Sequence, residues 1–222
     1  MATFLNLVQR LGREVGASGT LLTVTNATGE YARLVDWIGQ AWIEIQEVHP
    51  DYLWQRKSID FETVVGQGRY FPPEFTVPVT DFENWRNGSF RVYLDTVGNE
   101  NLMSQLPYDT YRDTYLYGTT RTTQGYPTVV TVAPDKSILI ALIPDRVYHI
   151  VADYYTLPQE LLIDTDVPTM PSRFHMAIVY KAMQWYGSYE NAPEVVMRGI
   201  DGYTRLMSNL TYDQTQSVMV RR

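Results

Sequence analysis

The sequence contains no cysteine, and this absence excludes several kinds of site at once. None of its 222 residues can form a disulfide, a thiolate metal site or a cysteine nucleophile. Positive charge is also scarce, because 18 Lys and Arg residues stand against 25 Asp and Glu residues and leave a formal net charge of −7. We therefore expect an acidic protein whose stability comes from a hydrophobic core and needs no covalent cross-links.

Clusters of basic residues are missing as well, and the longest basic block is Arg221 with Arg222. A protein that binds a DNA duplex tightly replaces condensed counterions by several Lys or Arg contacts, which no segment of this chain supplies. We therefore expect no specific binding of DNA, and an acidic surface that repels it.

Long apolar runs are absent from the amino-terminal residues. Residues 1–16 mix apolar side chains with polar and charged ones, so they fit neither a signal-peptide core nor a membrane span. The interrupting side chains are those of Asn6, Gln9, Arg10, Arg13 and Glu14. The whole chain is 45% hydrophobic and 19% charged, as globular domains are. We expect no secretion and no membrane segment.

Apolar residues at helical spacing predict two amino-terminal helices. The first covers residues 4–15, with Thr3 as a candidate N-cap. The second covers residues 30–48, with Thr28 as a candidate cap and Pro50 as the stop. Its apolar stripe consists of Leu34, Ile38, Ala41, Trp42, Ile45 and Val48.

Residues 54–155 alternate mostly with a period of two, which indicates strands. The first strand, whose inward residues are Ile59, Phe61, Thr63 and Val65, runs into Gly66-Gln67-Gly68, a signal for a hairpin turn. Further strands are predicted at 128–132, 138–142 and 146–155, and a short helix at 105–116. In the last strand one face is formed by Tyr148, Ile150, Ala152 and Tyr154.

The helical period returns after residue 157 and predicts helices over 172–186 and 193–210. Pro193 suits a first helical turn, where the missing N–H costs nothing. The packing seam of the last helix is predicted to consist of Val196, Ile200, Tyr203, Met207 and Leu210. The polar residues 211–222 are expected to extend away from the body.

Two pairs of amphipathic helices, one at each end of the chain, must each cover an apolar stripe, and they do so most simply by packing together. The predicted fold class is therefore α+β: a helical bundle built from N- and C-terminal helices with an inserted antiparallel β domain. The expected boundaries are 1–52 and 157–212 for the helical domain, 53–156 for the β domain, and 213–222 for an extended tail.

Residues for catalysis or metal binding do not form a recognisable pattern. His49, His149 and His175 are not at metal-ligand spacing, and we expect structural roles for them. Gly66-Gln67-Gly68 precedes residues that cannot open a helix, so it does not predict a phosphate site. The acidic residues of the β region that could form an acid–base pair are Asp60, Glu62, Asp81 and Glu83, but solvated strand faces explain them better. No catalytic, cofactor-binding or metal-binding residue is predicted.

The aromatic content is the unusual feature of the composition, with 17 Tyr and 5 Trp residues. Aromatic side chains combine a large contact area with few rotatable bonds, so they are enriched at interfaces. In and beside the β region they are Trp54, Tyr70, Trp85, Tyr93, Tyr108, Tyr111, Tyr115, Tyr117 and Tyr126. We expect most of them in the core and about a third at an interface.

Both helical ends resemble the head-to-tail adaptor proteins of tailed bacteriophages, a family that includes tail tubular protein A. The carboxyl-terminal segments that carry this resemblance are 171–183, 203–207 and 213–214, and the amino-terminal ones are 34–42 and 45–46. The strand at 150–155 resembles the family more loosely.

The resemblance implies a non-catalytic virion subunit, assembled in the host cytoplasm, that needs no cofactor. It implies a homo-oligomeric ring of about twelve copies between the portal protein and the tail nozzle protein, which provides the tail attachment platform and a channel for DNA. The helical part would face the portal and the β part the nozzle. In such proteins the carboxyl-terminal segment can reach into the portal, so the hypothesis for the portal-docking tail is Val218, Val220, Arg221 and Arg222.

Two other functions remain open from the residues. Aromatic and acidic side chains in the β region also fit a carbohydrate-binding or cell-wall-degrading virion protein. A tail terminator is the other alternative, because it too is a virion module without catalytic residues.

Overall fold

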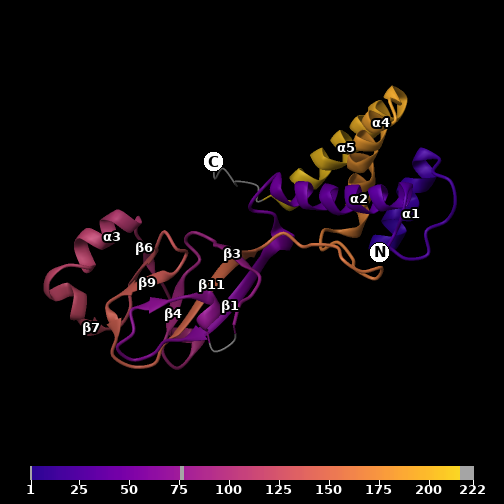
Figure 1. Ribbon diagram of the computed structural model, residues 1–222. Coiled ribbons are helices and arrows are strands. Elements are labelled where there is room, and N and C mark those ends of the chain that lie inside the picture. The colour runs from indigo at the N-terminus through magenta and orange to yellow at the C-terminus, as the bar shows by residue number, and fades with distance from the viewer. Residues whose placement is uncertain (1, 76–77, 216–222) are drawn as a thin grey trace. The chain divides into compact units, whose positions relative to one another are not determined.

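The computed structural model describes residues 2–75 and 78–215. The chain folds as two compact units, each with its own core (Figure 1). The helical unit comprises Met1–Gln55 and Pro158–Arg222, and the β unit comprises Arg56–Leu157. The fold class predicted from the sequence, helices from both ends around an inserted β region, is confirmed.

The amino-terminal helices of the helical unit form where the apolar periodicity predicts them. Helix α1 covers Phe4–Val15; the side chain of Thr3 accepts a hydrogen bond from the Asn6 N–H, and Gly16 ends the helix in the left-handed conformation, with φ +77°. Helix α2 covers Glu30–Glu47. The predicted cap of α2 is wrong, because its N-cap is Gly29, without a side-chain hydrogen bond.

The carboxyl-terminal helices pack against the amino-terminal ones, so that the indigo and yellow ends of the chain lie in one unit (Figure 1). After the short 3₁₀ turn η5, Ser172–Phe174, helix α4 covers Met176–Tyr189 and helix α5 covers Pro193–Gln214. Pro193 lies in the first turn of α5, as predicted. Residues 211–214, expected in the tail, belong to α5.

Helices α4 and α5 approach closely because three glycines lie where their backbones meet. A Cβ atom at Gly199 would lie 2.8 Å from the Tyr180 carbonyl oxygen, and one at Gly202 would lie 2.7 Å from the Tyr180 ring. On α4, a Cβ atom at Gly187 would lie 2.7 Å from Val196. These glycines correct the predicted seam, which included Ile200; that side chain is 40% exposed.

One buried glutamine fastens the start of the second helical segment to α2. The Gln46 side chain is 2% exposed; its oxygen accepts the Gln159 N–H at 2.7 Å, and its amide donates to the Gln159 carbonyl at 3.0 Å. Farther on, the Asp164 carboxylate accepts the Val24 N–H at 2.6 Å. These bonds hold residues 159–167, which precede helix α4 in the chain, against α2 and Val24.

The β unit contains a 5-stranded sheet with β11, His149–Thr156, at its centre (Figure 1). All pairings in this sheet are antiparallel, and its other strands are β1 (Arg56–Glu62), β3 (Phe82–Trp85), β4 (Arg91–Tyr93) and β5 (Asn101–Leu102). The predicted inward face is confirmed, because Tyr148 and the alternate β11 residues Ile150, Ala152 and Tyr154 are all buried.

A 4-stranded sheet and a 2-stranded sheet complete the unit. The first contains β2 (Arg69–Tyr70), β9 (Ile138–Ala141), β8 (Val129–Val132) and β6 (Ser104–Gln105), and the second contains β10 (Ile143–Pro144) and β7 (Gln124–Gly125). The pairs β6–β8 and β10–β7 are parallel, so the β region is not purely antiparallel. Helix α3, Tyr108–Tyr115, forms inside the predicted helical stretch, after Pro107.

The hairpin predicted at Gly66-Gln67-Gly68 is wrong. The chain does turn there, with Gly66 at φ +80°, but the flanking strands join different sheets: β1 pairs with β11, and β2 pairs with β9. The inward alternation also stops at Thr63, which is 2% exposed, whereas Val65 is 53% exposed. Partners far along the chain therefore decide the pairing.

Candidate functional site

The three histidines lie in separate places and have structural contacts. His49 lies edge-on to Tyr52, with ring centroids 5.4 Å apart, and His149 stacks on Tyr93 at 4.7 Å. In residues 2–75 and 78–215, no group of three or more His, Asp and Glu side chains could hold a metal ion. The expectation of structural roles agrees with these contacts.

His175 is the most enclosed histidine, with 3% of its surface exposed. Its Nδ1 atom lies 3.4 Å from the Ala2 N–H, and its Nε2 atom lies 3.1 Å from the Met170 carbonyl oxygen. The neutral tautomer with hydrogen on Nε2 satisfies both contacts. Burial lowers the pKa of His175 below its ordinary value of 6.5, which favours this neutral form.

Of the four carboxylates considered for an acid–base pair, Asp60 and Glu62 both lie beside His149, whereas Asp81 lies elsewhere. Asp60 accepts a hydrogen bond from the Tyr93 hydroxyl at 2.7 Å and lies 3.4 Å from His149. Asp81 pairs with Lys57 at 2.5 Å and accepts a hydrogen bond from Tyr154. Because His149 and Tyr154 are five residues apart on β11, these groups lie about 16 Å from each other along the strand.

The environment of Asp81 favours a permanent charge. Partial burial by itself would raise the pKa of Asp81, but the hydrogen bond and positive charge of Lys57, with the hydrogen bond from Tyr154, outweigh it and lower the pKa below its usual value. A carboxylate held charged by a lysine is a poor proton donor at neutral pH. This arrangement is an ion pair that joins β1 to the residue before β3.

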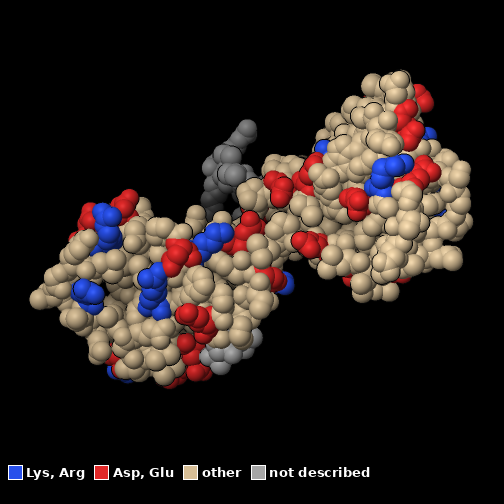
Figure 2. All heavy atoms as spheres, viewed as in Figure 1, with Lys and Arg blue, Asp and Glu red and all other residues tan. Residues whose placement is uncertain are grey.

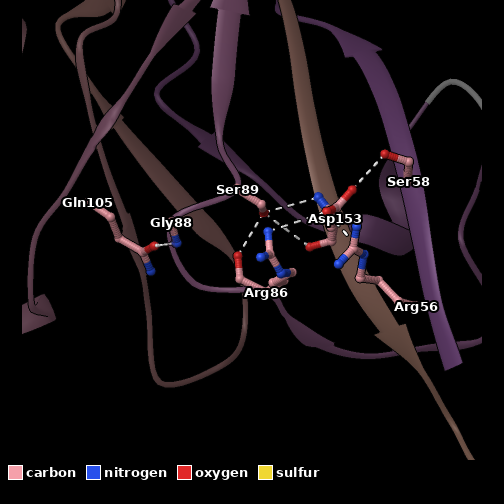
Figure 3. A network of polar contacts seen from close by, with 7 residues as sticks. All are labelled: Arg56, Ser58, Arg86, Gly88, Ser89, Gln105 and Asp153. Atoms are coloured by element: carbon pink, nitrogen blue, oxygen red, sulfur yellow. Dashed lines mark hydrogen bonds and ion pairs between the residues drawn. The ribbon is translucent and has the colours of Figure 1, made fainter. Parts of the chain in front are cut away.

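The densest polar network of the β unit centres on Asp153 in β11 (Figure 3). The guanidinium groups of Arg56 and Arg86 lie 3.3 and 3.5 Å from its Oδ2 atom, and the Ser58 hydroxyl donates to Oδ1 at 2.7 Å. The backbone N–H of Asp153 donates to the Ser89 hydroxyl oxygen at 3.0 Å, and that hydroxyl donates to the Arg86 carbonyl at 2.7 Å.

This network fixes the turn between β3 and β4. Gln105 in β6 extends it, because its side-chain oxygen accepts the Gly88 N–H at 2.5 Å and its amide donates to Asn87 at 3.0 Å (Figure 3). Its three charged side chains, those of Arg56, Arg86 and Asp153, are paired with one another, so the network is a structural link between β1, β11 and the turn. Partly exposed ion pairs of this kind contribute about 1 kcal/mol or less each.

Most aromatic residues of the β region are in its core, as expected. Tyr70, Trp85, Tyr93 and Tyr111 are each less than a tenth exposed. The large exposed aromatic side chain there is that of Tyr117, at 62%, just beyond helix α3. The β region therefore presents fewer aromatic contacts than its composition suggests.

The helical unit carries a partly exposed aromatic cluster that the sequence did not predict. Trp37 of α2 lies 6.1 Å from the Tyr186 ring and 5.8 Å from the Tyr189 ring of α4. The Arg33 guanidinium lies over the Tyr189 ring at 4.6 Å, and Tyr189 is 57% exposed. We call Arg33, Trp37, Tyr186 and Tyr189 the aromatic cluster. The sequence feature that could have predicted this cluster is the spacing of Arg33 and Trp37, which lie one helical turn apart and outside the apolar stripe of α2.

The proposed portal-docking residues Val218, Val220, Arg221 and Arg222 lie outside the described residues. Among the described residues, no helix is both long enough and apolar enough to cross a membrane. On the face shown in Figure 2, red and blue side chains are interspersed over the β unit, without a broad basic surface.

Comparison with protein families identifies the chain over almost its full length. The family model described as SU10 adaptor protein matches residues 2–222. No curated protein matches the sequence. The matching family consists of structural adaptor proteins and is not an enzyme family, which agrees with a site made of static ion pairs and packed rings. The resemblance seen in the two helical ends is thereby confirmed: the chain belongs to the SU10 adaptor protein family of phage head-to-tail adaptors.

Proposed function

We propose that the protein forms a ring of about twelve copies between the portal protein and the tail nozzle protein of a phage particle. The observation that carries this proposal is the family match over residues 2–222. The ring assembles in the host cytoplasm, becomes part of the virion and provides the platform to which the tail attaches. Its helical units face the portal and its β units face the nozzle.

The division into two units supports a role between two different partners. Each unit has its own hydrophobic core, so each can present a rigid surface. A closed ring also needs two different complementary patches on every copy, and a chain with several exposed helical faces can supply them.

The charge of the chain supports a role as the wall of a DNA channel. Each copy carries a formal charge of −7, so twelve copies carry about −84. Such a wall repels phosphate groups, and DNA passes without being held at specific contacts. Deletion of acidic side chains that face the channel should therefore slow DNA passage, whereas a DNA-binding protein would respond in the opposite way.

The portal contact is assigned to the end of the chain. Helix α5 runs to Gln214 and is followed by a segment that contains Val218, Val220, Arg221 and Arg222. Two apolar side chains and two guanidinium groups within five residues can combine burial with charge-assisted hydrogen bonds in a portal groove.

The experiment compares the full chain with a chain that lacks residues 217–222, each mixed with purified portal rings. Electron microscopy and native mass spectrometry should show the full chain as a second ring on the portal and a large loss of binding for the shortened chain. Unchanged binding of the shortened chain would remove the docking role of these residues. Binding to the end of a tail tube, with none to the portal, would contradict the adaptor position.

A further inference from the structure

Helix α5 has apolar side chains outside its α4-facing side that the described residues of the helical unit leave exposed. Its inner face packs on α4 through Gly199 and Gly202. On the outside, Met197 is 57% exposed and Ile200 is 40% exposed. An amphipathic helix normally has one apolar face, so two large side chains on the opposite face indicate a second packing partner.

Two carboxylates flank these outer apolar side chains. Glu194 precedes Met197 by three residues and Asp201 follows it by four, so all three lie along one side of α5. Neither carboxylate forms an ion pair within residues 2–75 and 78–215. We call Glu194, Met197, Ile200 and Asp201 the outer stripe of α5.

The aromatic cluster has the complementary chemistry. It contains Trp, Tyr and Arg, the three residue types most enriched among the side chains that dominate binding energy at protein interfaces. The Arg33 guanidinium stacks on Tyr189 and has no carboxylate partner in the described chain, whereas Glu30 beside it accepts the Tyr186 hydroxyl. The cluster thus presents an apolar ring surface with one guanidinium group that forms no ion pair among the described residues and lies near the carboxylates of Glu30 and Glu190.

The two surfaces lie on opposite sides of α4. Tyr180 faces α5, against Gly199 and Gly202, whereas Tyr189 faces α2, against Trp37. These tyrosines are nine residues apart, which is about two and a half helical turns, so their side chains leave α4 in opposite directions. The outer stripe lies beyond α5, on the side of α5 that faces away from α4.

We propose that the outer stripe of α5 in one copy packs against the aromatic cluster of the next copy. Met197 and Ile200 cover the exposed ring of Tyr189 and the partly buried ring of Trp37 beside it, and Arg33 pairs with Glu194 and Asp201. Because the two surfaces differ and lie on opposite sides of the unit, the contact is head-to-tail and repeats around a ring. The inference rests on the proposed function in one respect, that the functional assembly is a ring of copies of this chain.

Opposite charges are also available at the edges of this contact. Glu190, at the end of α4, borders the aromatic cluster. Arg205, one turn beyond Asp201 on α5, likewise has no ion-pair partner among the described residues. A neighbouring copy that places Asp201 near Arg33 can therefore also bring Arg205 near Glu190, so that both pairs join opposite charges.

The test uses charge reversal on each surface separately. The variants are Arg33→Glu and the double substitution Glu194→Arg with Asp201→Arg. Each alone should weaken self-association at least about tenfold, because like charges then meet at every contact. An equimolar mixture should assemble again, because copies of the two kinds alternate and each contact then joins opposite charges. The rescue also shows that both variants are folded.

Cross-linking locates the contact. The chain has no cysteine, so single cysteines can be placed beside the surfaces as Gln40→Cys on α2 and Thr204→Cys on α5. A mixture of the two should give a cross-linked dimer about a hundredfold faster than a mixture of Thr204→Cys with Ser18→Cys, an exposed control position, because contact raises the effective concentration from about 10 μM to about 1 mM.

Both measurements are made with the protein alone and with portal rings present. Failure of the mixture to assemble, or no cross-link above the control in either condition, would overturn the proposed contact. Cross-linking of either variant with itself would overturn it as well, because it indicates a two-fold contact. Portal binding of the unmodified chain is followed in parallel. If the contact is absent but the unmodified chain binds the portal, the contact is rejected and the proposed function stands. If the contact is present but the chain does not bind the portal, the proposed function is rejected and the contact stands.

Discussion

The two units are built from the chain in opposite ways. The helical unit combines two segments, Met1–Gln55 and Pro158–Arg222, whereas the β unit is the continuous stretch Arg56–Leu157. The register of the central sheet makes this possible, because Arg56, at the start of β1, pairs with Tyr155 near the end of β11. The inserted unit thus returns the chain to the point where it left, and the closure of a long insertion adds only a small entropic cost to the helical unit.

The units also differ in what holds their elements together. In the helical unit, glycines allow close helix contact and Gln46 fastens a crossing segment. In the β unit, partly exposed ion pairs around Asp153 and Asp81 join neighbouring strands. Ion pairs at the surface stabilise little, while packed cores stabilise much. Each unit also has its own hydrophobic core, so the helical unit should be the more sensitive only at its glycines, where α4 and α5 leave no room for an added methyl group.

The largest effect is expected from the core substitutions Trp42→Ala and Ile150→Ala, one in each unit. Both side chains are fully buried. Trp42→Ala should therefore lower the free energy of unfolding by about 3–5 kcal/mol, and Ile150→Ala by about 2–5 kcal/mol. Because the cores are separate, hydrogen exchange measured by mass spectrometry should rise only in the unit that carries the substitution. A parallel rise in both units would mean that they unfold as one.

The glycine substitutions test the close contact of α4 and α5 within the helical unit. Gly202→Ala should destabilise it by about 1–3 kcal/mol, because the new Cβ atom would meet the Tyr180 ring. Gly39→Ala is the matched control, because nothing lies within 4 Å of its added Cβ atom, and it should stabilise α2 by up to about 1 kcal/mol. Urea denaturation measures both. Effects of the same sign would contradict the close approach of α4 and α5.

Removal of the central carboxylate of the β unit tests the minor role of its ion pairs. Asp153→Asn keeps the shape and an acceptor for Ser58 but loses the attraction to Arg56 and Arg86. The free energy of unfolding of the β unit should fall by about 1 kcal/mol or less, and by less still in high salt. A loss of several kcal/mol would show that this network, and not the core, determines the stability of the unit.

The smallest expected effect is a dependence of the stability of the helical unit on pH. Burial lowers the pKa of folded His175 below 6.5, so below pH 6.5 the unfolded chain binds a proton that the folded chain excludes. Stability should therefore fall as the pH decreases from 6.5 towards the lower pKa of the folded state. His175→Gln should remove this part of the pH dependence in denaturation curves, and His49→Gln should retain it.

Particular elements show how far the sequence predicts this fold. The helices α1, α2, α4 and α5 and the inward face of β11 follow from apolar periodicity, which is a local property. The hairpin at Gly66 was wrong because β1 and β2 find partners far along the chain. The seam of α5 was wrong at Ile200 because two glycines allow α4 closer than apolar spacing suggests.

The element types, the division into helical ends and a β insert, the acidic charge and the resemblance to the adaptors all follow from the sequence alone. Which apolar side chains stay uncovered depends on how the elements pack in the tertiary fold. Periodicity marks every apolar face as a packing surface, but it cannot say whether the partner belongs to the same chain. Met197 and Ile200 on α5, and Tyr189 on α4 beside Trp37, became candidate contacts because the described part of the helical unit leaves these three side chains exposed.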